Sequence, residues 1–124
     1  MFAARGLATL VMLATTALGI PCYKHARDPT GKNCVDLNKF GQFASDWCAD
    51  NFNTSSGDWQ MYPDGEGNTG SIGKLGQFND SASCKAAAQE SIDTCKAGGW
   101  DGAVWSADGV NLNLNFCAWV DPSA

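Results

Sequence analysis

Residues 80–99 read DSASCKAAAQESIDTCKAGG, and this stretch decides the expected fold. Three alanines in a row form helix strongly, Asp80 or Ser81 can cap its start, and Gly98-Gly99 ends it. The stretch therefore predicts a helix over residues 80–97. Its buried stripe recurs at three- and four-residue steps and consists of Cys84, Ala88, Ile92 and Cys95.

The two cysteines of this helix cannot pair with each other. They stand eleven residues apart, which is about 16 Å along a helix axis, whereas bridged α-carbons lie within about 7 Å. Each is therefore expected to be bridged to another element, one of them being the strand of Cys117. The same argument disfavours a Cys34–Cys48 pair, because a second helix is expected over residues 36–50. The sequence leaves the remaining pairings open.

The rest of the chain adds that second helix and several strands. Apolar residues of 36–50 recur at helical steps behind Asp36, which can cap the helix. The Asp108-Gly109 pair favours a tight hairpin turn with positive backbone dihedrals. Strands are expected at residues 59–62, 71–78, 103–105 and 110–120. Two helices packed on an antiparallel sheet predict an α+β fold, an α/β sandwich.

An apolar leader precedes all the cysteines. Arg5 is followed by the apolar run 7–14 and by Ala17-Leu18-Gly19, a site that a signal peptidase could cut. We expect residues 1–19 to be a signal peptide and residues 20–124 to be one disulfide-stapled domain. An even number of cysteines behind such a leader predicts three disulfides and a secreted, extracellular protein. These cysteines are Cys22, Cys34, Cys48, Cys84, Cys95 and Cys117.

Charge and hydropathy disfavour two kinds of partner. The net charge is −5 and the one basic group, Lys24 with His25 and Arg27, is small. No basic cluster is therefore offered to nucleic acid or to anionic membranes. No second apolar segment follows the leader, so no integral membrane association is expected. Asn53 and Asn79 begin N-glycosylation sequons, and both are expected on exposed loops.

Catalytic and metal sites receive little support. His25 and Arg27 suit a solvated N-terminal segment better than a ribonuclease site. Asp64 and Glu66 form the one carboxylate pair expected to reach a cleft, as glycoside cleavage requires. Residues 64–70 alternate like a calcium loop but lack its sixth-position glycine and closing glutamate. We expect no metal, no cofactor and no catalysis.

Aromatic and amide side chains carry the main functional signal. A tryptophan ring can stack on the C–H face of a pyranose, and an amide can donate to one hydroxyl while accepting from its neighbour. Alternation along 110–120 places asparagines opposite the leucines, although Cys117 shares the asparagine face and favours a second layer over part of it. The candidate glycan contacts are Trp59, Tyr62, Trp100, Trp105, Asn111, Asn113 and Trp119.

The cysteines also keep a loose spacing relative to the helices, the glycine pair and the final strand. The residues that carry it are Cys22-Tyr23, Trp47-Cys48, Cys84, Ile92, Cys95, Gly98-Gly99 and Cys117. This pattern resembles small secreted cysteine-rich proteins of fungi, above all mushroom glycan-binding proteins with an α/β sandwich. Cys34 and the glycine-rich loop depart from the pattern. The resemblance implies a lectin-like protein that binds glycans or glycoproteins without catalysis. A toxin or effector of killer-toxin-like architecture is the alternative, and a small secreted hydrolase is the third.

Overall fold

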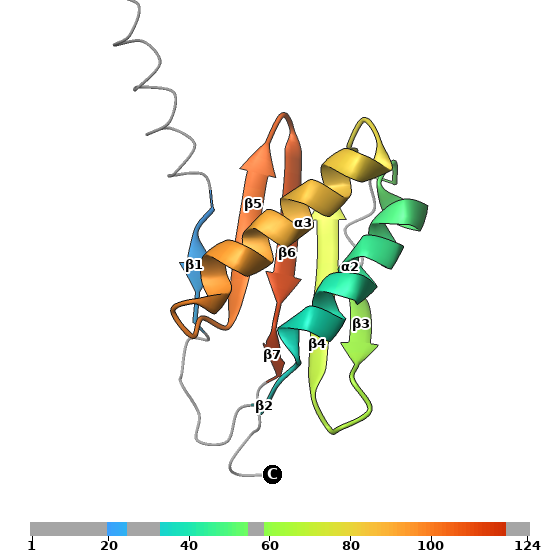
Figure 1. The fold of residues 1–124 in the computed structure, drawn as a ribbon. Helices are drawn as coiled ribbons and strands as arrows, with labels where there is room; N and C mark the ends of the chain where they lie inside the picture. The colour runs from blue at the N-terminus through green and yellow to red at the C-terminus, as the bar shows by residue number, and fades with distance from the viewer. Residues whose placement is uncertain (1–19, 25–32, 55–58, 119–124) are drawn as a thin grey trace, which may run out of the picture.

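The computed structural model describes residues 20–24, 33–54 and 59–118 and shows the expected α+β fold. Helices α2 (Leu37–Asn51) and α3 (Ser81–Lys96) lie on one face of a five-stranded antiparallel sheet of order β1-β5-β6-β4-β3 (Figure 1). Its strands are β1 (Cys22–Tyr23), β3 (Gln60–Pro63), β4 (Thr69–Leu75), β5 (Gly102–Ala107) and β6 (Val110–Asn115). Two short strands, β2 (Asn33–Cys34) and β7 (Cys117–Ala118), pair separately. The expected signal peptide, His25, Arg27 and Trp119 lie outside the described residues.

Both helices begin at an aspartate cap: Asp36 is the cap predicted for α2, and Asp80 is one of the two caps predicted for α3. The Asp36 carboxylate accepts from the backbone N–H groups of Asn38 and Lys39, at 2.8 and 3.2 Å, and Asp80 accepts from Ser83 N–H at 2.7 Å. These bonds satisfy donors that a helix start leaves unpaired. Each helix turns one stripe toward the sheet and its partner helix. The buried residues are Phe40, Ala44, Trp47 and Cys48 in α2, and Cys84, Ala87, Ala88, Ser91, Ile92 and Cys95 in α3.

The hairpin between β5 and β6 has the turn that its sequence predicts. Asp108 and Gly109 both have positive φ angles, 53° and 80°. Such a turn matches the twist of the strands that it joins. The hairpin fixes a register in which Trp105 pairs with Leu112 and Val104 pairs with Asn113. The leucines of β6 consequently face the helices, where Leu112 and Leu114 are fully buried.

The expectation of one continuous strand over 110–120 is wrong, because the strand breaks at Phe116 and residues 119–120 lie outside the described residues. β6 ends at Asn115, because the N–H of Phe116 donates to the carbonyl of Asp101 at 2.7 Å and its carbonyl accepts from Val35 N–H at 2.9 Å. These bonds turn the chain out of the large sheet and into β7. Phe116 and Cys117 are consequently both buried, although simple alternation places them on opposite faces.

Three disulfides join Cys22 to Cys95, Cys34 to Cys117, and Cys48 to Cys84. The exclusion of Cys84–Cys95 and Cys34–Cys48 is confirmed, and α3 is stapled twice. The expected bridge from α3 to the strand of Cys117 is wrong. Residues 34 and 117 are direct partners across β2 and β7, which places their α-carbons 3.9 Å apart. The partners of α3 are therefore α2 and β1.

The outer edge of the sheet at β3 is blunted by a proline. The N–H of Asp64 donates to Asn68 O at 2.9 Å. Tyr62 and Gln60, two and four residues before Asp64, therefore also direct their backbone N–H and C=O groups toward β4. Met61 and Pro63 alternate with these residues and point their backbone groups outward. Proline has no N–H, so position 63 offers no donor to a further strand.

Candidate functional site

The sheet face opposite the helices carries the asparagines of β6. Asn111 is exposed and Asn113 is half-buried, and in the register they lie opposite Leu75 and Gly73 of β4. Directly paired residues of an antiparallel sheet share a face. We call this surface the open face, because both helices cover the other side (Figure 1).

No helix among the described residues is long and apolar enough to cross a membrane.

Three large apolar side chains are exposed beside these amides. Trp59 is 50% exposed, Met61 56% and Leu75 59%. Trp59 and Met61 alternate onto the same side of β3, and Met61 pairs with Ser71 of β4. Since most large apolar side chains of the described residues are buried, a cluster of three on one surface marks a candidate binding region.

Trp59, Leu75, Asn111 and Asn113 line one shallow hollow. Its volume is about 190 Å³, and Gly73 forms part of its wall. Gly73 has no side chain, and it is itself buried. The hollow thus brings together three of the seven candidate glycan contacts, namely Trp59, Asn111 and Asn113.

The two amides present complementary groups to this hollow. Asn111 donates from Nδ2 to Ser106 Oγ at 3.0 Å, and Asn113 Oδ1 lies 3.2 Å from the hydroxyl of Tyr23. Among the described residues, Asn111 Oδ1 and Asn113 Nδ2 have no side-chain or backbone partner. One strand therefore offers an acceptor and a donor two residues apart, which is about 7 Å.

Tyr23 is a supporting residue that sequence reasoning missed. Its ring lies over Gly102, where any Cβ would collide with the ring and with the carbonyl oxygen of Leu114. Its hydroxyl shares one proton between Leu114 O, at 3.1 Å, and Asn113 Oδ1. Burial, together with the negative charge of Asp101, raises the pKa of Tyr23 to about 12. The hydroxyl therefore stays neutral and orients the Asn113 amide.

None of the described strand residues on the open face is charged. Those residues are Tyr23, Met61, Pro63, Thr69, Ser71, Gly73, Leu75, Gly102, Val104, Ser106, Asn111, Asn113 and Asn115. Lys74 also lines the hollow, but it pairs with Leu112 and its side chain belongs to the other face. Its ammonium donates to the carbonyls of Thr54 and Gly76, the latter at 3.0 Å, and lies 6.0 Å from the Trp47 ring centre.

The other candidate aromatics lie elsewhere. Tyr62 stacks on Phe43 of α2 with ring centres 4.7 Å apart, so it belongs to the helix side of the sheet. Trp105 also lies on the helix side, where its ring centre is 5.4 Å from that of Phe78. Trp100 is exposed between α3 and β5, with Lys24 Nζ 5.7 Å from its ring. The seven candidates therefore do not form one surface.

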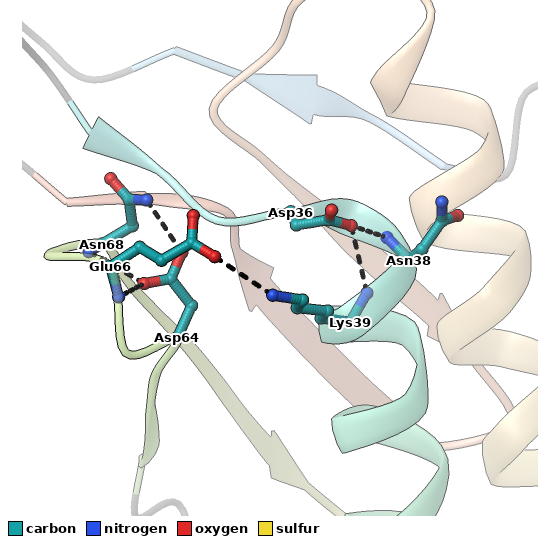
Figure 2. A network of polar contacts seen from close by, with 6 residues as sticks. All are labelled: Asp36, Asn38, Lys39, Asp64, Glu66 and Asn68. Carbon is teal, nitrogen blue, oxygen red and sulfur yellow. Dashed lines mark hydrogen bonds and ion pairs between the residues drawn. The ribbon is translucent and has the colours of Figure 1, made fainter.

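The carboxylates of the β3–β4 turn have structural partners (Figure 2). Asp64 accepts from the N–H of Glu66 at 2.7 Å and from Asn68, through N–H at 3.1 Å and Nδ2 at 2.8 Å. The Asn68 side-chain hydrogen bond is the main reason that the pKa of Asp64 is lowered. Glu66 pairs with Lys39 of α2 at 3.2 Å. These groups close the turn and tie it to α2.

One grouping among the described residues has the spacing of a metal site, and its sulfurs are already bonded. Cys34, Asp101 and Cys117 lie within 4.8 Å of one another. Cys34 and Cys117 form a disulfide with each other. A disulfide sulfur is not a thiolate, so this cluster does not present the soft anionic ligands that a zinc site uses.

Both sequon asparagines are exposed. Asn53 follows the end of α2, and Asn79 directly precedes the cap of α3.

No protein-family model matches this chain, and no curated protein sequence matches it.

Proposed function

We propose that this protein is a secreted, non-catalytic binding protein for a neutral glycan and that the glycan lies on the open face. The observation that carries the proposal is the hollow in which the exposed ring of Trp59 stands beside the amides of Asn111 and Asn113. An apolar plate next to hydrogen-bonding groups suits a sugar, which has an apolar C–H face and a polar rim.

Each group has a separate part in binding. The Trp59 ring stacks on a pyranose, and Leu75 extends the apolar contact. Asn111 Oδ1 accepts from one hydroxyl while Asn113 Nδ2 donates to another. Because Tyr23 already holds Asn113 Oδ1, the amide loses little freedom when the sugar binds.

The lack of charge on the described open face supports a neutral ligand. A sugar acid would call for a lysine or arginine, and an amino sugar for a carboxylate. Neither is found among the described strand residues of that face. The structural partners of Asp64 and Glu66 support assigning binding rather than glycoside cleavage. The three disulfides support secretion, since such bonds persist in oxidising compartments.

A glycan array followed by titration calorimetry tests the proposal. Wild-type protein is expected to bind one or more neutral glycans, and Trp59→Ala to weaken binding about tenfold, the effect of losing roughly 1.4 kcal/mol of ring stacking. Trp100→Ala is the matched control, because Trp100 is also exposed but lies outside the hollow. Its affinity should change less than about twofold.

Three outcomes contradict the proposal. The first is that no neutral glycan binds, and the second is that Trp59→Ala and Trp100→Ala weaken binding equally. The third comes from sedimentation of the same variants. If wild type is a dimer and Trp59→Ala is a monomer without effect on glycan binding, the apolar cluster is an interface between two copies of this chain.

A further inference from the structure

A second hollow lies on the helix side of the sheet, away from the open face. It is formed where the β5–β6 hairpin meets the segment that leads into α3, and its volume is about 260 Å³. Phe78 and Trp105 supply its aromatic wall, with ring centres 5.4 Å apart and planes tilted by 40°. Gln77, Ser83 and Asp108 supply polar groups around it. This combination again suits a sugar ring.

Asn79 lines this same hollow and is exposed. It begins the sequon Asn79-Asp80-Ser81, whose first residue is an acceptor for N-linked glycans in secreted proteins. Asn53, the other sequon asparagine, is not among the residues that line the hollow. The two sequons therefore differ in what surrounds an attached sugar.

We propose that Asn79 is N-glycosylated when the chain passes through a eukaryotic secretory pathway, and that the first sugar lies in this hollow against Trp105. The donor is a lipid-linked diphospho-oligosaccharide. Asn79 Nδ2 forms a bond to the anomeric carbon, the bond from that carbon to the diphosphate oxygen breaks, and the amide nitrogen loses one proton. The inference concerns a different face from the glycan-binding proposal and does not rest on it.

Tethering makes the contact favourable. A sugar attached at the rim needs no separate association, so modest stacking suffices to keep it in place. The Trp105 ring is held in position by Phe78 on one side and by a hydrogen bond from its Nε1 to Glu90 Oε1 at 3.4 Å. Trp105 remains partly exposed, which leaves ring surface for the sugar.

The test uses the full chain with Asn53→Gln, so that Asn79 is the one remaining sequon. The protein is secreted from a eukaryotic host, and its glycan is trimmed enzymatically to a single N-acetylglucosamine. The comparison form is the same chain made without glycosylation. Peptide mass mapping is expected to find the sugar on Asn79. Nuclear Overhauser contacts are expected between the sugar ring protons and the Trp105 indole.

Thermal unfolding gives a second readout. The sugar-bearing form is expected to have a Tm about 3–6 °C above that of the bare form. In a Trp105→Leu background, with the three disulfides verified by mass, this difference should fall below about 1 °C. Comparing the two differences removes any direct effect of Trp105→Leu on folding.

Either of two results overturns the proposal. One is an unmodified Asn79 in a host that glycosylates the sequon of a second secreted protein expressed beside it. The other is a modified Asn79 without sugar–indole contacts, whose sugar changes the Tm equally in the Trp105 and Trp105→Leu backgrounds. That result would describe a glycan that projects into solvent.

Discussion

Tyr23 illustrates how much one side chain organises at the residue scale. Its ring occupies the space that Gly102 leaves empty, and its hydroxyl reaches across to β6. The same burial that places it there disfavours the phenolate, because a buried charge loses its hydration. The position of Asn113 and the pKa of Tyr23 thus have one structural origin.

The stability of the protein is predicted to fall above about pH 10 through this residue. The pKa of Tyr23 is about 12 in the folded protein and near 10 in an unfolded chain. Between these values the folded state binds more protons, so the stabilisation is complete below about pH 10 and is lost as the pH rises to about 12. Urea unfolding at several pH values measures this slope. Tyr23→Phe should remove the Tyr23 contribution.

Lys74 acts in the opposite sense, which makes the Tyr23→Phe comparison necessary. Burial lowers the pKa of Lys74, so its contribution to stability increases as the pH rises toward its unfolded value. Because Lys74 is present in both proteins, the difference between them isolates Tyr23. Equal slopes in wild type and Tyr23→Phe would contradict the prediction.

Single residues were predictable where a local period decides their environment. Leu112 and Leu114 are buried as alternation predicts, and Asn111 and Asn113 lie on the opposite face. Tyr62 shows the limit of such reasoning. Its environment depends on pairing with Gly70 and on the approach of Phe43 from α2, and no short stretch of sequence carries that information.

At the scale of elements, the disulfides differ in how far the fold protects them. Cys48 and Cys84 are fully buried between α2 and α3, whereas Cys34 is exposed in the two-stranded ribbon of β2 and β7. A thiolate reductant must reach a sulfur atom to attack it. The Cys48–Cys84 disulfide between the two helices is therefore the best protected of the three disulfides.

Mild reduction is predicted to open Cys34–Cys117 before Cys48–Cys84. Limited treatment with a thiol reductant, alkylation and peptide mass mapping would identify the first bond opened. Cys34→Ser with Cys117→Ser should leave a protein that resists the same treatment longer than wild type does. Alkylation of Cys48 and Cys84 first would contradict this order, because both sulfurs are buried in the folded state.

The outer edge of β3 is predicted to depend on Pro63. Pro63→Val restores an outward N–H on an exposed edge and should promote association through that edge. Light scattering after size-exclusion chromatography should then detect larger species. Gln60→Val is the matched control, since it also raises β propensity but its backbone groups already point toward β4. Equal association of both variants would point to side-chain hydrophobicity instead.

The helices could be predicted from the sequence, and the end of the sheet could not. Asp36, Asp80 and the alanines of α3 are local signals that act within one or two turns. The break at Phe116 depends on bonds to Asp101 and Val35, which come from distant parts of the chain. The choice of Cys34 as the partner of Cys117 has the same non-local origin.

At the scale of the whole molecule, charge is unevenly distributed. The chain has a net charge of −5, yet the described strand residues of the open face are all uncharged. The field of an acidic protein repels anions and attracts cations over several ångströms. The affinity for a charged ligand would therefore depend on this field and on the salt that screens it.

Binding of the proposed neutral glycan is predicted to be insensitive to salt. Raising the salt from about 50 to 500 mM shortens the screening length severalfold, but should change Kd less than about twofold. Titration calorimetry across that range provides the measurement. A tenfold change would indicate a charged ligand, and Asn111→Asp should then alter the salt dependence, whereas Ser106→Ala should not.

Because Lys74 is buried, chemical labelling of its amine can detect local opening of the protein around it. Lys74 is 3% exposed, and its amine donates to the carbonyls of Thr54 and Gly76. Amine-reactive labels attack neutral, accessible amines and thus first modify exposed lysines such as Lys39 and Lys85. Label on Lys74 requires the segment after α2 to separate from β4. The ratio of label on Lys74 to label on Lys85 therefore measures how often that corner of the protein opens, without any engineered probe.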